Sequence, residues 1–326
     1  KVFITRIIPE AGLKLLRDAG IEIHEWKKKR ELTPAELIEY CKPCDALLVA
    51  GYNKIDAHFL QQCKHLKVVA LHSVGFDSVD VPEATRLKIP IGNTPGVVSV
   101  ATADTAFLLM LAVARKAFYL HKKIIKGEWK YFEPTVNLGI ELTGKTLGIY
   151  GLGKIGFEMA KRCAGAYNMK IIYNNRHNNL EAEKTLNAKL VSFDELLNES
   201  DVISVHSVLS DETKGKFDKT SFEKMKPSSI FINTARGRIH NEKDLVSALE
   251  KGTIWGAGLD VTDPEPMHPD NPLLNMPNAA VLPHIGTATD TTRNAMATIA
   301  AKNVIAGLSG KRIPFPVNPE VYDHKN

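Results

Sequence analysis

Three residues of different chemistry, an arginine, a glutamate and a histidine, each follow a short apolar run in the C-terminal half of the chain. They are Arg236 in FINTARG, Glu265 in GLDVTDPEP and His284 in LPHIG. The runs are rich in Ile, Val, Leu and Ala, and helix-like segments separate them, which is typical of buried strands in a parallel sheet. They span residues 229–235, 256–261 and 279–283. Because ligands of such sheets bind beyond the carboxyl ends of the strands, we expect these side chains to form an active site there.

The chemistry open to this set is proton transfer beside a bound anion. His284 suits proton transfer because an imidazole titrates near neutral pH. Glu265, if it pairs with the ring, would favour the imidazolium form. The planar guanidinium of Arg236 could clamp a carboxylate and polarise a neighbouring carbonyl group. Each residue alone has an ordinary explanation, as a surface cation, a solvated loop acid or a hydrogen-bonded histidine. Their occurrence together on a chain with a nucleotide signature favours catalysis.

A glycine-rich turn supplies that nucleotide signature. Gly151-Leu-Gly153-Lys-Ile-Gly156 directly follows the strand pattern TLGIY and opens the helical pattern KIGFEMAKRCA. The first glycine permits the tight turn, the second lets the backbone approach a pyrophosphate, and the third allows the helix to pack closely on the strand. The helix N-terminus presents free N–H groups to the phosphates. With a second strand pattern at 170–174, the motif predicts dinucleotide binding.

The end of that second strand indicates which dinucleotide is bound. Domains that bind NAD(H) usually carry an acid there, which bonds the ribose 2′-hydroxyl and would repel a 2′-phosphate. This chain has Asn175 and Arg176 instead. Asn175 removes the repulsion and Arg176 offers a fork of donors to the phosphate, so we expect a preference for NADP(H). The alternative is that Arg176 only stacks on the adenine and that NAD(H) also binds.

Two series of alternating strand and helix patterns must position these residues, which predicts an α/β fold with doubly wound parallel sheets. The strand patterns of the first series span 1–6, 21–26, 45–51, 68–74 and 89–92. Those of the second series span 146–150, 170–174, 188–191 and 202–206, followed by the three apolar runs. We expect a discontinuous substrate-binding domain, 1–98 with 288–326, and a nucleotide domain, 99–287, with a substrate cleft between the domains.

Three helices have distinct sequence patterns. TPAE at 33–36 combines a threonine cap, a proline and a returning glutamate, which predicts a capping box at a helix start. The stretch 99–116 is apolar on all sides of a helix, so we expect deep burial between domains or in a subunit contact. The last helical pattern spans about 288–308 and follows Thr287 or Thr289 as its cap.

Composition and charge exclude several classes of protein. The 326 residues are 44% hydrophobic and 24% charged, as in a globular protein with two domains of ordinary size. No run approaches about 18 apolar residues and no leader pattern opens the chain, so we expect a cytoplasmic protein without a membrane partner. The net charge of +5 is spread along the chain, and the basic run KKKR at 27–30 is more typical of a solvated turn than of a nucleic-acid-binding patch.

The four cysteines do not form a recognisable reactive site. Cys41 and Cys44 have the spacing of a redox dithiol, but they follow a helical pattern, whereas a reactive dithiol is stabilised at a helix N-terminus. No second pair completes a zinc site. We therefore expect inert thiols, no metal and a reducing compartment.

Together, these motifs resemble those of the D-isomer-specific 2-hydroxyacid dehydrogenases. LHSVGFDSVD at 71–80, the glycine fingerprint, INTARGR, GLDVTDPEP and LPHIGTAT occur in the family's order and spacing, nearly from end to end. Within the family the chain is most similar to the glyoxylate/hydroxypyruvate reductases, because NPLL and PHIGTAT follow GLDVTDPEP and the second strand ends without an acid. The resemblance implies a Rossmann nucleotide domain, a flavodoxin-like substrate domain and a homodimer that pairs through its nucleotide domains.

The resemblance also implies a reaction. His284 would donate the proton in the NADPH-linked reduction of glyoxylate or hydroxypyruvate to the D-2-hydroxy acid. Glu265 would tune that histidine, and Arg236 would clamp the substrate carboxylate. Backbone N–H groups of the turn Ser73-Val74-Gly75 would bind the same carboxylate from the other domain.

Further cofactor contacts follow from the same resemblance. Asp260 would bond the nicotinamide carboxamide. The remaining contacts are expected from residues beside the motifs, namely Lys154, Ile155, His206 and Thr234. The segment HSVLSDET at 206–213 departs from the family pattern, because Val208 and Ser210 stand where a proline and a threonine are usual. Its contacts with the cofactor are therefore open.

Two alternative functions fit the same motifs. One is the reduction of longer, sugar-derived 2-oxo acids such as 2-ketogluconate. The other is a dinucleotide-sensing scaffold resembling the transcriptional corepressors of this family, which keep the arginine, glutamate and histidine. A formate dehydrogenase fits less well, because that branch has glutamine where this chain has Glu265.

Overall fold

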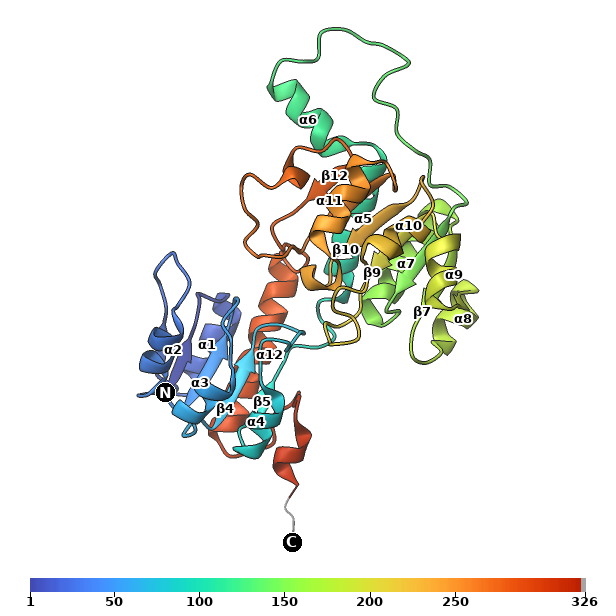
Figure 1. Cartoon of the computed structure of the whole chain (residues 1–326). Helices are drawn as coiled ribbons and strands as arrows, with labels where there is room; N and C mark the ends of the chain where they lie inside the picture. Colours follow the sequence, from blue (N-terminus) through green and yellow to red (C-terminus); the bar gives the residue numbers. More distant parts are fainter. Residues whose placement is uncertain (324–326) are drawn as a thin grey trace. The chain divides into compact units, whose positions relative to one another are not determined.

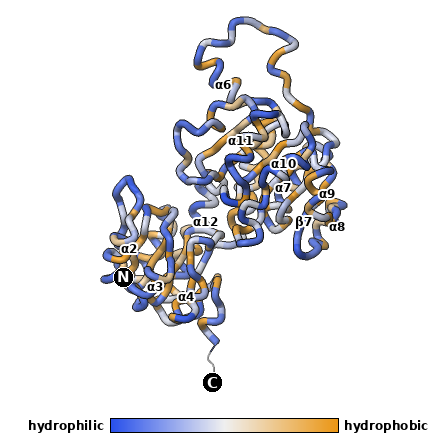
Figure 2. Tube along the Cα trace, in the orientation of Figure 1, coloured by the Kyte–Doolittle hydropathy of each residue, from blue (hydrophilic) through white to orange (hydrophobic). Residues whose placement is uncertain are grey.

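The computed structural model describes residues 1–323, which form two compact units, each with helices packed on a parallel sheet (Figure 1). Unit 1 contains Lys1–Val98 and the segment from Ala288 onward, and unit 2 contains Ser99–Thr287. Hydrophobic stretches of the chain lie mostly in the interior of each unit (Figure 2). The predicted α/β class with two parallel sheets is confirmed. Among the described residues, no helix is both long and apolar enough to span a bilayer.

Unit 1 is built on five parallel strands in the order β2-β1-β3-β4-β5. The strands are β1 (Val2–Ile4), β2 (Ile23–Glu25), β3 (Ala46–Val49), β4 (Val68–Leu71) and β5 (Ile91–Gly92). The helices are α1 (Glu10–Asp18), α2 (Pro34–Cys41), α3 (Ala57–Gln62), α4 (Val81–Arg86) and α12 (Asp290–Leu308), with a 3-10 helix at Pro319–Tyr322. Leu48 packs with α1 and α12, whereas Leu47 and Val49 pack with α2 and α3. Helices therefore cover both faces of the sheet, because side chains alternate along a strand.

Unit 2 is built on seven parallel strands in the order β12-β11-β10-β9-β6-β7-β8. The strands are β6 (Thr146–Tyr150), β7 (Lys170–Asn174), β8 (Lys189–Leu190), β9 (Val202–Val205), β10 (Ile230–Asn233), β11 (Gly256–Leu259) and β12 (Ala279–Val281). The chain runs outward from β6 to β8 and then returns to β9 on the other side of β6. Such a reversal opens a crevice beyond the carboxyl ends of the two central strands, where ligands bind in sheets of this type.

The helices of unit 2 lie on both sides of its sheet (Figure 1). They are α5 (Ser99–Ala114), α6 (Ala117–Ile125), α7 (Lys154–Tyr167), α8 (Leu180–Leu186), α9 (Phe193–Glu199), α10 (Lys219–Lys224) and α11 (Glu242–Glu250), with 3-10 helices at Gly237–Ile239 and Pro272–Leu274. The apolar helix α5 is packed against β10, β11 and α7 of its own unit. A Cβ at Gly258 would lie 2.9 Å from Leu109 Cβ, so glycine permits this close approach. Packing within unit 2 thus explains most of the burial that the sequence predicts for 99–116.

The predicted helical stretch 99–116 corresponds to α5, and a second helix, α6, follows it without a sequence prediction. Lys116 adopts a left-handed conformation, with φ of 54°, which separates the two helices. After α6, a long loop stands away from the sheet of unit 2 before the chain returns to β6 (Figure 1). None of the α6 side chains is buried.

Local signals placed several helix ends correctly. The predicted capping box at α2 is confirmed, because Thr33 accepts the Glu36 N–H and the Glu36 carboxylate accepts the Thr33 N–H. The last helix begins after Thr289, whose hydroxyl accepts the Thr292 N–H, which selects one of the two expected caps. Most predicted strands are longer than the observed ones by one to three residues, because residues at the strand ends leave the ladder. For example, β4 ends at Leu71, three residues before the end of the predicted strand 68–74.

The cysteines are all unpaired and buried. Cys41 is the last residue of α2, so the Cys41–Cys44 spacing lies at a helix C-terminus. Burial raises the pKa of the Cys44 thiol and raises that of Cys163 to about 12. The thiols of Cys44 and Cys163 are accordingly poor nucleophiles near neutral pH, whereas the hydrogen bond with Cys41 lowers the pKa of Cys63.

Candidate active site

Arg236, Glu265 and His284 follow β10, β11 and β12, which are neighbours in the sheet of unit 2. The carboxyl ends of these parallel strands lie at one edge, so the structure brings the glutamate and histidine together there. His284 Nδ1 lies 3.2 Å from Glu265 Oε2. The carboxylate is four-fifths buried and the imidazole one-third exposed. This geometry provides the pairing that the sequence pattern predicts.

The backbone around Glu265 fixes its carboxylate. Its Oε1 accepts the Thr262 N–H at 3.1 Å, while its other oxygen faces His284. The Thr262 hydroxyl donates to the Pro264 carbonyl at 2.8 Å, which closes the loop between them. A Cβ at Gly237 would lie 2.0 Å from the Thr262 carbonyl oxygen. Only glycine therefore fits directly after Arg236, where the two loops meet.

Asp260 anchors the loop that carries His284. Its carboxylate is buried, and its two oxygens accept the Ile285 and Gly286 N–H groups, each at 2.7 Å. Burial raises the pKa of Asp260, and the two N–H donors act in the opposite direction. His284 itself has a φ of 53°, a backbone conformation that residues other than glycine seldom adopt. Asp260 thus helps to hold the histidine in an unfavourable backbone conformation, a role that the motif alone does not reveal.

The glycine turn between β6 and α7 has the three features that pyrophosphate binding requires. Gly151 has a φ of 95°, and a Cβ there would lie 2.6 Å from the Ser207 nitrogen. A Cβ at Gly153 would meet no atom within 4 Å, so the backbone is open on that side. A Cβ at Gly156 would lie 2.8 Å from the Gly151 carbonyl oxygen. The third glycine therefore allows α7 to begin directly against the turn.

The N-terminus of α7 lacks the side-chain cap that most helices of this chain have. Its N-cap residue is Gly153, and no side chain accepts its first N–H groups. Within the described residues, the N–H groups of Lys154, Ile155 and Gly156 have no hydrogen-bond acceptor. Unsatisfied N–H groups at a helix N-terminus, together with the helix dipole, favour a phosphate. The residues present thus fit the pyrophosphate of a dinucleotide.

Asn175 holds the glycine turn rather than pointing away from it. Its Oδ1 accepts the Leu152 N–H at 2.6 Å, and its Nδ2 donates to the Leu152 carbonyl at 3.2 Å. Asn179, which also caps α8, donates to the same carbonyl at 3.0 Å. Two amide side chains therefore fix the peptide between the first two glycines. No sequence motif points to Asn179, and only its spacing of four residues from Asn175 suggests a shared role.

The remaining predicted cofactor residues lie at the ends of β7, β9 and β10. The Arg176 guanidinium pairs with Glu212, which lies in the loop after β9. His206 Nε2 lies 2.8 Å from Ser204 Oγ, and its Nδ1 lies 3.5 Å from Thr234 Oγ1. Burial lowers the pKa of His206 to about 3, so the imidazole is neutral at physiological pH.

The loop 206–213, which departs from the family pattern, is ordered by a threonine. The Thr213 hydroxyl accepts the Ser210 N–H at 2.8 Å and donates to the Val208 carbonyl at 2.7 Å. The Ser210 hydroxyl lies 3.3 Å from Thr213 Oγ1. Val208 is exposed and Ser210 half-buried, so neither unusual residue disturbs the core.

Ser73, Val74 and Gly75 lie in unit 1, in the turn after β4. The Ser73 hydroxyl donates to the Gly75 carbonyl at 2.7 Å, and Asn93 Nδ2 donates to the Val74 carbonyl at 2.8 Å. Within residues 1–323, no protein group accepts the N–H of Val74 or Gly75. With its carbonyls tied down in this way, the turn presents two backbone donors that suit an anion.

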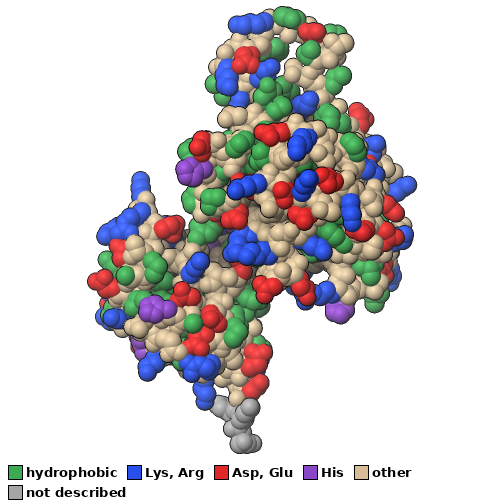
Figure 3. All heavy atoms as spheres, in the orientation of Figure 1, with side chains coloured by type: hydrophobic (Ala, Val, Ile, Leu, Met, Phe, Trp, Pro, Cys, Tyr) green, Lys and Arg blue, Asp and Glu red, His purple; other side chains and the backbone are tan. Residues whose placement is uncertain are grey.

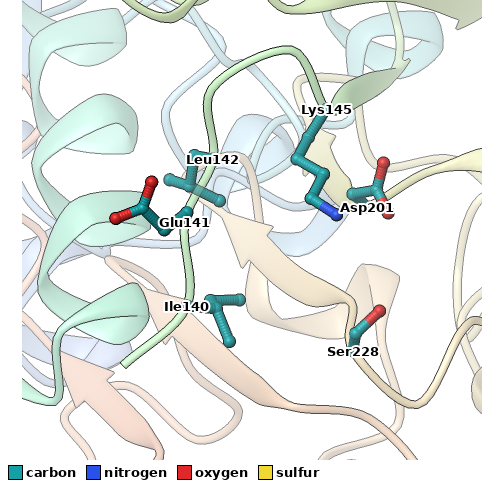
Figure 4. A pocket seen from close by; sticks show the side chains of 6 residues that line it. All are labelled: Ile140, Glu141, Leu142, Lys145, Asp201 and Ser228. Atoms are coloured by element: carbon teal, nitrogen blue, oxygen red, sulfur yellow. The ribbon is translucent and has the colours of Figure 1, made fainter. Parts of the chain in front are cut away.

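One hollow in unit 2 lies far from this chemistry. It has a volume of about 240 Å³ and is lined by six residues, namely Ile140, Glu141, Leu142, Lys145, Asp201 and Ser228 (Figure 4). Lys145, Asp201 and Ser228 precede β6, β9 and β10, so the hollow is at the amino edge of the sheet, opposite the carboxyl ends that carry the glycine turn and the triad. It is not part of the candidate site.

Known proteins are similar to nearly the whole of this chain. The family model described as D-isomer specific 2-hydroxyacid dehydrogenase, NAD binding domain, matches residues 107–286. A glyoxylate reductase from Thermococcus litoralis is 43% identical over 325 residues, which cover 98% of this chain and 97% of the relative.

Solved structures with the same fold include two reductases. A glyoxylate reductase from Paecilomyes thermophila has a TM-score of 0.85 at 34% identity and covers 97% of both chains. The NADPH-dependent glyoxylate/hydroxypyruvate reductase from Sinorhizobium meliloti, solved with NADP and malonate, has a TM-score of 0.84 at 27% identity, with 100% of this chain and 98% of that chain covered. From its matched sequence, its two parallel sheets and its nucleotide-binding turn, this chain belongs to the D-isomer-specific 2-hydroxyacid dehydrogenases, a family of NAD(P)-dependent oxidoreductases.

Proposed function

We propose that the chain reduces a small 2-oxo acid, glyoxylate or hydroxypyruvate, to the D-2-hydroxy acid with NADPH. The observation that carries this proposal is the 3.2 Å pair of His284 Nδ1 and Glu265 Oε2 at the edge of the sheet where the glycine turn also lies. The names of the relatives support the substrate class, since the Thermococcus litoralis protein is a glyoxylate reductase. The Sinorhizobium meliloti structure supports both the substrates and the phosphorylated cofactor.

The geometry assigns a direction to the proton. Because Nδ1 of His284 faces the Glu265 carboxylate, the proton to be transferred is the one on Nε2. The carboxylate would hold the ring in this orientation by accepting the Nδ1 proton. The nicotinamide cofactor, when bound, supplies the hydride for the carbonyl carbon. His284 would then protonate the carbonyl oxygen, so that one hydride and one proton convert the oxo acid into the hydroxy acid.

Each unit contains one further group that suits a carboxylate. Arg236 follows β10 with its Nη1 donating to the Ala235 carbonyl at 2.8 Å, which restrains the guanidinium. We propose that the N–H groups of its planar guanidinium bind the substrate carboxylate and polarise the neighbouring carbonyl group. The turn of Ser73, Val74 and Gly75 in unit 1 would contribute its backbone N–H groups to a carboxylate ligand.

The preference for NADPH is proposed from the end of β7. A carboxylate at position 175 would repel a 2′-phosphate, and Asn175 is instead bonded to the glycine turn. Arg176 follows it, with its side chain 72% exposed and available to a phosphate once its pair with Glu212 opens. An arginine next to the ribose accommodates the 2′-phosphate in domains of this type.

Initial rates test the function directly. Glyoxylate, hydroxypyruvate and 2-ketogluconate would be reduced near pH 7 with NADPH and NADH at matched concentrations. Faster turnover of the small acids with NADPH is expected. Preference for NADH would refute the cofactor assignment, and turnover of 2-ketogluconate alone would establish the longer sugar acids as substrates. A failure of all three substrates would refute the proposal and favour the scaffold alternative.

We also propose that the chain forms a homodimer through unit 2. The end of α6 and the loop after it expose large apolar side chains, including Ile125 (73%), Trp129 (72%), Tyr131 (73%) and Phe132 (84%). Apolar side chains are exposed along this projecting segment in Figure 3. So much apolar surface in one segment marks an interaction site, and a second copy of the chain would bury it. Light scattering should give a dimeric mass that becomes monomeric in a Trp129→Ser, Phe132→Ser variant, and a monomeric mass of the unaltered chain would contradict the proposal.

A further inference from the structure

The carboxylate of Glu212 is paired with Arg176, the cation to which the proposed function assigns the 2′-phosphate. Arg176 Nη2 lies 2.5 Å from Glu212 Oε2. Arg176 follows β7, and Glu212 lies 36 residues later in the loop after β9. These strands flank β6, the strand that leads into the glycine turn. The pair therefore joins two segments at the carboxyl edge where a dinucleotide binds.

The charges of the pair also act on Tyr150, the residue before the glycine turn. Tyr150 is the last residue of β6 and immediately precedes Gly151. Burial raises the pKa of Tyr150, the charge of Glu212 raises it further, and Arg176 opposes that effect. Both charges thus act on the residue from which the pyrophosphate-binding turn begins.

Lysine side chains lie on the same surface as the Glu212 carboxylate. Glu212 lines a surface hollow of about 420 Å³ together with Lys214, Lys216 and Lys224. Lys216 lies over the Phe193 ring, with its Nζ 4.3 Å from the ring centroid. If Arg176 rotates toward a phosphate, Glu212 can therefore approach lysines on the same side.

We propose that Glu212 is a selectivity residue that weakens NADPH binding relative to NADH. Its carboxylate holds Arg176 in competition with a 2′-phosphate, and it places a negative charge next to the phosphate site. NADH has a ribose hydroxyl at that position and no charge to repel. This inference depends on the proposed role of Arg176, and it implies that the chain retains appreciable affinity for NADH. It would make the preference for NADPH moderate rather than absolute.

The test is a binding titration that needs no turnover. Dissociation constants for NADPH, NADH, 2′,5′-ADP and 5′-AMP would be measured by calorimetry for the full chain and for Glu212→Gln. The matched control is Glu223→Gln, an exposed glutamate of α10 that pairs with Lys219 at 3.8 Å and gives the same change in net charge. Arg176→Ala completes the set.

Glu212→Gln should bind NADPH and 2′,5′-ADP about 2- to 5-fold more tightly, because an exposed charge pair contributes little and the released guanidinium meets a phosphate of nearly two negative charges. Its affinity for NADH and 5′-AMP should change less than about twofold, and the gain should shrink at high salt. Equal gains for both cofactors, or the same gain in Glu223→Gln, would overturn the inference.

Arg176→Ala separates the two proposals. If it weakens NADPH binding while Glu212→Gln changes nothing, the role of Glu212 is wrong and the proposed NADPH preference stands. If Arg176→Ala leaves NADPH binding unchanged, the phosphate is not bound at Arg176 and the proposed basis of the preference fails as well.

Discussion

Asp260→Asn should reduce catalysis by releasing the loop that carries His284. The wild-type carboxylate accepts two backbone N–H groups, from Ile285 and Gly286, at 2.7 Å each. In the variant one oxygen becomes an NH₂ group that faces an N–H donor, so one of the two hydrogen bonds is lost and the other loses its charge. Because residue 260 is only 1% exposed, water cannot replace the lost acceptor.

The expected magnitude follows from these two bonds. A hydrogen bond to a charged group contributes about 1.5–3 kcal/mol, and weakening the second bond adds about 1 kcal/mol. Relief from burying a charge offsets part of the loss, which leaves a net cost of about 2–3 kcal/mol. For a unit of this size, the midpoint of thermal unfolding should fall by about 5–10 °C. If displacement of His284 carries most of that cost, kcat should fall about 10- to 100-fold.

The assay must separate positioning of His284 from direct contact with the cofactor. Unfolding temperature, kcat at saturating cofactor and the cofactor dissociation constant would be measured for Asp260→Asn and for Asp201→Asn. Asp201 also accepts a backbone N–H, that of Thr146 at 2.8 Å, but it lies at the opposite edge of the same sheet. Asp201→Asn should lower the unfolding temperature and leave kcat unchanged.

A kcat of Asp260→Asn within twofold of the wild-type value would refute the positioning argument. If only the cofactor dissociation constant rises, Asp260 acts on the nicotinamide carboxamide, as the family resemblance implies, and not through the histidine loop.

Three further predictions test other parts of unit 2. His284→Ala should lose most turnover while its NADPH dissociation constant stays within about threefold, and loss of cofactor binding with turnover per bound site preserved would contradict its role as proton donor. Gly156→Ala should destabilise the chain by about 1–3 kcal/mol and weaken cofactor binding, because its Cβ would lie 2.8 Å from the Gly151 carbonyl oxygen. Gly165→Ala in the same helix, where a Cβ meets no atom within 4 Å, should instead stabilise by about 0.5–1 kcal/mol in urea unfolding, and equal effects of the two changes would disprove the packing argument. Burial lowers the pKa of His240 from 6.5 to about 4. Between these pH values the histidine binds a proton in the unfolded chain but not in the folded chain, so stability should fall as the pH drops from 6.5 toward 4. At about 1.4 kcal/mol per pKa unit, the wild type should lose about 3 kcal/mol of its free energy of unfolding between pH 7 and pH 4. His240→Gln lacks this loss, so its free energy of unfolding relative to that of the wild type should rise by the same amount. A difference in urea midpoints that stays constant over this pH range would count against the prediction.

The sequence alone determined the elements and the kind of chemistry, because both depend on local patterns. The strands 146–150 and 170–174 are apolar runs bounded by turn residues, and they match β6 and β7. The glycine spacing specifies a turn whose backbone constraints act within six residues. The capping box of α2 is likewise a contact between neighbours in the chain. In such cases the competing conformations are few, and one local signal selects among them.

Only the tertiary structure decided which groups hold the site in place. The bonds from Asp260 to the loop after His284, from Asn175 to Leu152 and from Arg176 to Glu212 each join residues 23 to 36 positions apart. A pattern of residue types contains no signal for such pairs, because each partner is an ordinary polar residue until the sheet aligns the ends of its strands. The motifs therefore identify the chemistry of this chain, whereas the order of strands in its second sheet determines how that chemistry is positioned.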